Sequence, residues 1–137
     1  MKASEHMRLG SMLQPQGFNK LFTEDGSSCA IGAIMQSSGI ADSLAQVKFE
    51  VIVNIHATLR ATFPILAQHP QFLPPGMAGD LDLLYGPRLT VQQTIIFLNN
   101  IARWPREQIA DYLEKLEEAA EVQAAGATLK QGEYCEA

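Results

Sequence analysis

The stretch Leu98–Leu116, which reads LNNIARWPREQIADYLEKL, contains the clearest helical pattern in this 137-residue chain. It holds the only Trp, two adjacent Asn, and Pro105, a residue type favoured at the first position of a helix. From Ile109 onward, apolar residues recur at spacings of three and four, which places them on one helix face. The stretch therefore predicts two helices that meet at a corner near Trp104, a C-terminal helical hairpin.

Two segments upstream also have helical signatures. Thr90 and Gln93 form the Thr-x-x-Gln capping box that commonly begins a helix, and an apolar stripe follows through residues 91–102. The run CAIGAIM at 29–35 is apolar on nearly every face and precedes Gly39. We therefore expect a short buried helix that ends near this glycine and packs at the centre of the fold.

Residues 42–63 fit two different periods. Their apolar positions match helical spacing, but the residues from Val47 to Leu59 also alternate between apolar and polar, as in a strand. Because about 20 residues without Gly or Pro is long for a strand, we predict a helix. Nearer the N-terminus we expect Ser4 to cap a first helix. The apolar side of that first helix is expected to be Met7, Leu9, Met12 and Leu13.

Residues 64–88 contain five Pro and three Gly, which predicts a long irregular loop. Loops of this length often have a function, and we expect Leu81, Leu83, Leu84 and Tyr85 to pack part of it onto the core. Past Gln123 the sequence loses its periodicity. The prediction is an all-α fold: a single compact domain of about five helices at 1–123, with this long Pro/Gly-rich loop and the C-terminal hairpin, followed by a flexible acidic tail at 124–137.

The charge is concentrated near the C-terminus. Residues 1–104 carry seven basic and seven acidic side chains, whereas residues 105–137 carry three basic and eight acidic ones, which gives the net charge of −5. Acidic helices repel phosphate backbones, so nucleic-acid binding by a helix-turn-helix around Trp104 is disfavoured.

We expect a non-enzymatic interaction module that binds a protein partner with a basic surface, or that self-associates as a homo-oligomer. The alternative is that the acids only solvate a helix face. The predicted contact residues are Glu107, Asp111, Glu114 and Glu118.

Asn99 and Asn100, next to Arg103 and Trp104, form a second candidate binding site. A pocket between these residues and the loop at 64–88 would make the protein a small ligand-binding protein or enzyme. The alternative is structural, because Asn near a helix end often satisfies free carbonyls or adopts the left-handed conformation. In that interpretation, which we favour, Trp104 is the apolar residue that fixes the corner.

The sequence contains no catalytic or metal-binding motif. Cys29 is placed at a predicted helix start, where a thiol can be activated, but His6, His56 and His69 are scattered and none forms a motif with it. A small buried hydrophobe is the simpler interpretation of Cys29. We therefore expect no metal, no cofactor and no catalytic residues. With neither a signal peptide nor an apolar span in the sequence, we expect a cytoplasmic protein that does not contact membranes.

Three stretches carry a resemblance to a known group: Lys2–Phe18, SCAIGA at 28–33, and Leu98–Glu114. Together they resemble small uncharacterised bacterial and phage-encoded proteins with a Cys-Ala-x-Gly-Ala helix, then Leu-Asn-Asp, a Trp, and Arg-Glu-x-Ile-Ala-Asp. The resemblance implies a helical fold and a prokaryotic or phage origin, and it implies no activity. This chain has Asn100 where the group usually has Asp, and Pro105 where a Thr or Ser cap is common. Relatives also often carry further Cys or His around the middle loop, where this chain has only His69.

Overall fold

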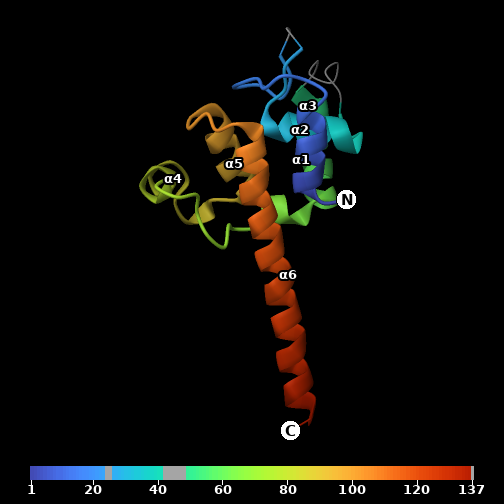
Figure 1. Ribbon diagram of the computed structural model, residues 1–137, viewed down its shortest axis with the longest axis vertical. Coiled ribbons are helices and arrows are strands. Elements are labelled where there is room, and N and C mark those ends of the chain that lie inside the picture. The colour runs from blue at the N-terminus through green and yellow to red at the C-terminus, as the bar shows by residue number, and fades with distance from the viewer. Residues whose placement is uncertain (24–25, 42–48, 137) are drawn as a thin grey trace.

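The computed structural model in Figure 1 describes residues 1–23, 26–41 and 49–136. Within these ranges the fold is all-helical, as predicted, and the only β pairing is in isolated bridges near Ser28. None of the described helices is long and apolar enough to cross a lipid bilayer. The helices are α1 Ala3–Ser11, α2 Ala30–Ser38, α3 Phe49–Thr62, α4 Ala78–Tyr85, α5 Val91–Asn100 and α6 Arg106–Glu136, with short 3-10 turns at Pro64–Ala67 and Gly86–Arg88.

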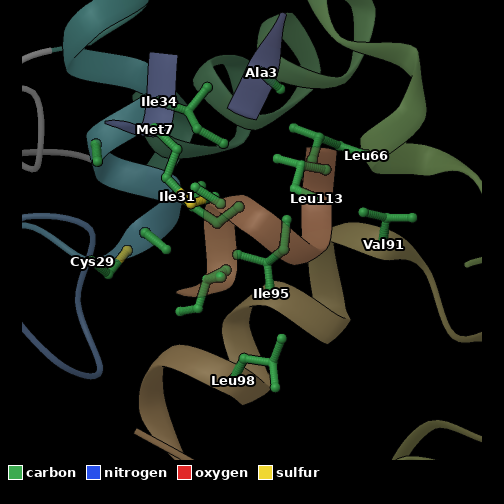
Figure 2. Packing of buried hydrophobic residues seen from close by; sticks show 14 of the residues in the cluster. Ala3, Met7, Cys29, Ile31, Ile34, Leu66, Val91, Ile95, Leu98 and Leu113 are labelled. Carbon is green, nitrogen blue, oxygen red and sulfur yellow. The ribbon is translucent and has the colours of Figure 1, made fainter. Parts of the chain in front are cut away.

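Helix α2 lies at the centre of the fold, as its apolar sequence predicts. Its residues 30–35 are all buried, and it contacts both α1 and α5. Helix α1 also contacts α6, so these helices enclose one core. In Figure 2, side chains from four helices meet there: Met7 of α1, Ile31 of α2, Ile95 of α5 and Leu113 of α6.

Two of the predicted helix boundaries are confirmed in detail. Thr90 and Gln93 form a complete capping box at the start of α5: the Gln93 amide donates to Thr90 Oγ1, and the Thr90 amide donates to Gln93 Oε1. Helix α2 ends at Gly39, which has a φ of 78°. A residue with a Cβ would be strained in this left-handed conformation, so the glycine fixes where α2 stops.

The prediction for the first helix is wrong in two respects. Lys2, not Ser4, is the N-cap of α1, and Ser4 is buried inside the helix. Of the expected apolar side only Met7 is buried, whereas Leu9, Met12 and Leu13 are 42%, 80% and 61% exposed. The buried side consists of Ala3, Ser4, Met7 and Gly10. These are mostly small residues, because α1 packs so closely on its neighbours that larger side chains would not fit on this face.

The middle of the chain is more regular than predicted. Helix α3 confirms that residues 49–62 are helical, while residues 42–48, with the predicted N-terminal part, lie outside the described residues. The segment at 64–88 was expected to be a loop, but it contains α4 and two 3-10 turns, which begin at Pro64 and at Gly86. Leu81 is buried as expected, whereas Leu83 and Leu84 are exposed, so the expectation that they pack on the core is wrong.

Helix α6 is the longest element and gives the molecule its shape. Its 31 residues correspond to a length of about 46 Å, and its C-terminal part extends away from the other helices (Figure 1). The helical backbone continues through residues 124–136, where the sequence predicted a tail. Helices α5 and α6 contact each other across the corner at 101–105, which confirms the predicted C-terminal pair.

Candidate functional site

The corner between α5 and α6 is closed by backbone hydrogen bonds. Arg103 adopts a left-handed conformation with a φ of 54°, and the Trp104 amide then turns back to donate to the Leu98 carbonyl over 2.8 Å. The Arg103 guanidinium lies 4.3 Å from the centroid of the Phe18 ring, a cation–π distance. Arg103 therefore holds the segment near residue 18 against the corner.

Asn99 is a buried polar side chain at this corner with four hydrogen bonds. It is 1% exposed, and its Oδ1 accepts from Gln16 Nε2 at 3.0 Å and from the Ala30 amide at 3.1 Å. Its Nδ2 donates to the Gly17 carbonyl at 3.0 Å and to Asn100 Oδ1 at 2.8 Å. Both donors and the oxygen of this amide are therefore used inside the protein.

Asn100 continues the same cluster towards the surface. Its Oδ1 accepts from the Asn19 amide at 2.8 Å in addition to Asn99 Nδ2. Gln16 completes the connection, because its Nε2 also donates to the Trp104 carbonyl at 2.8 Å. These three amides, which we call the amide cluster, join the end of α5 to residues 16–30. Their contacts match the structural interpretation of the Asn pair.

Arg106 is a buried cation that the sequence did not single out. It is 7% exposed, and its guanidinium donates to Ser28 Oγ at 2.8 Å and to the Ser28 carbonyl at 3.1 Å. It also donates to the carbonyls of Ser11, at 3.3 Å, and Gln14. All four acceptors are neutral oxygens: Ser11 is the last residue of α1, Gln14 lies just after that helix, and Ser28 lies just before α2. Arg106 thus ties α6 to both ends of this connection.

A sequence signal for Arg106 was present but weak. A cation in the first turn of a helix opposes the helix dipole, so Arg at this position needs another reason to be there. Here the reason is the set of backbone carbonyls. The Arg side chain is long enough to reach them, and its guanidinium can donate hydrogen bonds to all of them at once. The identity of those carbonyls depends on the tertiary fold and could not be read from the sequence.

Cys29 occupies the N-cap of α2, and its Sγ accepts from the Gly32 amide at 3.3 Å. Burial raises the pKa of this thiol, although the nearby amides and Arg106 act in the opposite direction. A protonated, buried thiol is a poor nucleophile. The environment of Cys29 therefore matches a packing residue that also caps a helix.

Five of the acidic side chains of α6 form one line along the helix. They occur at steps of four, three, four and three residues, and so fall within an arc of about 80° around the helix axis. All are exposed except Glu114, which is half-buried. We call this line the acidic stripe: Glu107, Asp111, Glu114, Glu118 and Glu121.

Helix α1 and its N-cap residue supply cations to part of the acidic stripe. Arg8 Nη2 lies 2.8 Å from both Asp111 Oδ1 and Glu114 Oε2, and Lys2 Nζ lies 2.7 Å from Glu121 Oε1. Among the residues whose side chains the structure describes, these are the only ion pairs, and Glu107 and Glu118 take part in none of them. The sequence predicted the acids of this face, but not that α1 would neutralise some of them.

A pocket of about 300 Å³ lies beside the stripe, between α6 and the segment that follows the first 3-10 turn. Its walls are mainly aromatic and apolar, and the Oη of Tyr112, one lining residue, donates to the carbonyl of Phe72, another lining residue, at 2.8 Å. We call this cavity the Trp104 pocket. It is lined by Phe72, Leu73, Pro75, Trp104, Gln108, Asp111, Tyr112 and Lys115. Of the predicted site residues, Trp104 and Asp111 both line this pocket. Asn99 and Asn100 belong to the amide cluster and do not line it.

Glu117 is a second buried charge that the sequence did not single out. It is 7% exposed and accepts hydrogen bonds from the Ser4 amide, at 3.3 Å, and from the Ser4 hydroxyl. A carboxylate at the N-terminus of α1 satisfies free amides and complements the helix dipole. Its position four residues after Leu113 places it on the buried face of α6, which was a usable signal.

We expect the stability contribution of Glu117 to depend on pH. Burial raises the pKa of this carboxyl above its ordinary value of 4.5, although the bonds from Ser4 oppose the shift. The folded protein therefore binds this proton more tightly than the unfolded chain does. The resulting stabilisation is fully present below pH 4.5 and is lost as the pH rises through the folded pKa.

Glu117→Gln cannot ionise and keeps an acceptor oxygen for Ser4. Relative to the wild type, its free energy of unfolding should therefore increase as the pH rises above 4.5 and then level off. Urea unfolding at a series of pH values measures this difference, with the exposed neighbour Glu118→Gln as the matched control. A Glu117→Gln difference that stays constant with pH would contradict the assignment.

Comparison with protein-family models, with curated proteins and with solved structures found no match for this chain. In the described part of the chain, no three His, Cys, Asp or Glu side chains converge as a metal site would require.

Proposed function

We propose that this protein is a non-enzymatic interaction module that binds a basic segment of a partner protein along the acidic stripe of α6. The observation that carries the proposal is the alignment of five carboxylates on one face of a helix. Two of them, Glu107 and Glu118, have no ion-pair partner among the described residues. A surface of one charge attracts and orients an oppositely charged partner.

Arg8 provides an example, within the chain, of how a cation binds this surface. One guanidinium nitrogen lies 2.8 Å from two carboxylates that are three residues apart in α6. The free Glu107 and Glu118 lie on either side of this group, about 16 Å apart along the helix axis. Two Lys or Arg residues about five positions apart in an extended segment would span that distance.

Charge also supports one class of partner over the others. A nucleic acid would be repelled by the stripe, and so would the same stripe on a second copy of the chain. We therefore favour a basic protein segment over nucleic acid and over self-association through this face. Sedimentation of the protein alone measures whether the chain self-associates through another face.

The test is binding of a lysine-rich peptide composed of Lys, Gly and Ser, with lysines five positions apart, to the folded protein. We expect measurable binding by calorimetry that weakens as salt is added, because the charges are solvent-exposed. The double variant Glu107→Gln/Glu118→Gln should weaken binding about fivefold. Lys115→Gln should have the opposite effect, because it removes a positive charge next to the stripe.

The matched control is Asp80→Asn/Asp82→Asn, which removes two exposed charges from α4 and should leave binding nearly unchanged. Thermal unfolding of each variant shows whether the fold is retained. If the α4 double variant weakens binding as much as the α6 double variant, the attraction is due to net charge and the proposal is wrong. Absence of peptide binding to the wild type would also overturn it.

A further inference from the structure

We infer that the Trp104 pocket receives one apolar side chain, of the size of phenylalanine, from the basic segment that binds the acidic stripe. This inference rests on the proposed function and specifies the chemistry of the partner. It adds an apolar anchor to a surface that otherwise offers only charge, and charge alone gives little discrimination between basic partners.

The lining of the pocket matches an aromatic or large aliphatic side chain. Trp104, Tyr112 and Phe72 provide three ring systems, and Leu73 and Pro75 add apolar surface. The Phe72 and Tyr112 rings are already edge to face, with centroids 5.7 Å apart and an interplanar angle of 88°. This contact, with the hydrogen bond from Tyr112 to the Phe72 carbonyl, holds two walls of the pocket in place before any partner arrives. A preorganised apolar pocket of this kind is where interface anchors bind.

The pocket and the acidic stripe form one continuous surface. Asp111 belongs to both, and Gln108 follows Glu107 directly in the sequence. Around the helix axis, Asp111, Lys115, Gln108 and Tyr112 follow one another from the stripe into the pocket. A segment whose cations contact Glu107 or Glu118 would therefore pass the mouth of the pocket.

The size and charge of the pocket restrict what occupies it. Its volume of about 300 Å³ is at the lower end of the range for small-molecule sites, about 300–1,000 Å³. That volume suits one side chain better than a nucleotide or other large cofactor. Lys115 stands at the rim, so a cation of the partner is disfavoured inside the pocket and belongs on the stripe side, near Asp111.

The single Trp of the chain makes the pocket directly observable. Two peptides are compared: the Lys/Gly/Ser peptide described above, and the same peptide with one central Gly replaced by Phe. We expect the Phe peptide to bind about tenfold more tightly, as burial of one apolar side chain would give. Only this peptide should shift the emission of Trp104 to shorter wavelength and protect it from acrylamide quenching.

A blocking variant tests the location without removing any part of the core. Gln108 is exposed, so Gln108→Phe should fill the pocket from its rim and abolish the preference for the Phe peptide. Val122→Phe is the matched control, because Val122 is an exposed α6 residue outside the pocket. It should leave the preference and the Trp104 response intact.

The outcomes separate this inference from the proposed function. If neither peptide binds, the proposed function fails. If both peptides bind equally and Trp104 emission does not change, the stripe is retained and the pocket inference is overturned. If Gln108→Phe keeps the preference, the anchor lies elsewhere and the inference is also overturned. If N-acetylphenylalanine amide alone binds as tightly as the Phe peptide, the pocket is a small-ligand site, not a partner contact.

Discussion

Gly10→Ala is expected to lower the free energy of unfolding by about 3 kcal/mol, although alanine is the better helix former. A Cβ on Gly10 would overlap the backbone carbonyl of Ala33, so α1 and α2 leave no room for a side chain at this point. Backbone atoms cannot move aside as a flexible side chain can. Helix α1 must therefore shift away from α2, which opens the contacts of Met7 and of Glu117 with Ser4.

Chemical denaturation of Gly10→Ala and of Gly126→Ala measures this effect with a matched control. Gly126 is also inside a helix, but a Cβ there would meet nothing within 4 Å. Gly126→Ala should therefore keep or slightly raise the stability, by up to about 1 kcal/mol. Equal effects of the two substitutions would show that helix propensity, not the contact between α1 and α2, determines the result.

Asn99→Asp is expected to be destabilising by about 3 kcal/mol, whereas Asn100→Asp should cost less than about 1 kcal/mol. Asn99 donates through Nδ2 to the Gly17 carbonyl and to Asn100 Oδ1, and an aspartate in its place would present an oxygen to both acceptors. In its bonds with the Asn19 amide and with Asn99, Asn100 uses only its oxygen. An aspartate at 100 can accept both bonds, so its cost is limited to a charge near the end of α5.

Thermal and urea unfolding of the two single variants, at neutral pH, gives the comparison. The substitution is the same, the residues are adjacent, and only the direction of the hydrogen bonds differs. If Asn100→Asp were as damaging as Asn99→Asp, the amide orientations described here would be wrong. If neither substitution had an effect, the amide cluster would not hold the end of α5 to residues 16–30.

The sequence predicted those elements whose signals are local. The capping box of Thr90 and Gln93 and the end of α2 at Gly39 each depend on a few neighbouring residues, and both are confirmed. Helix α4 was missed because Pro and Gly around it are typical of loops, and the exposed Leu83 and Leu84 have no core to face. The buried face of α1 was missed because close packing with α2 selected Gly10 over the larger Leu9 and Met12.

In the candidate site, too, the features with local signals were predicted and those that depend on long-range contacts were not. Glu107, Asp111, Glu114 and Glu118 share a helix face because of their spacing alone, so the sequence was sufficient to group them. The pairing of Arg8 with Asp111 and Glu114 joins residues about a hundred positions apart and depends on how α1 packs on α6. The aromatic pocket needs Phe72 beside Tyr112, which is also a long-range contact. Local patterns contain no information about either arrangement.

The most direct measurement of the central claim, that the exposed face of α6 is the binding surface, is a chemical-shift titration. The lysine-rich peptide with one Phe is added to the isotopically labelled protein, and the backbone amide signals are followed by NMR. We predict changes at Trp104, along α6 as far as Glu118, and in the segment around Phe72, with the amides of Gly17, Ala30 and Asn99 unchanged. Changes centred on the amide cluster, or spread evenly over the molecule, would contradict the account.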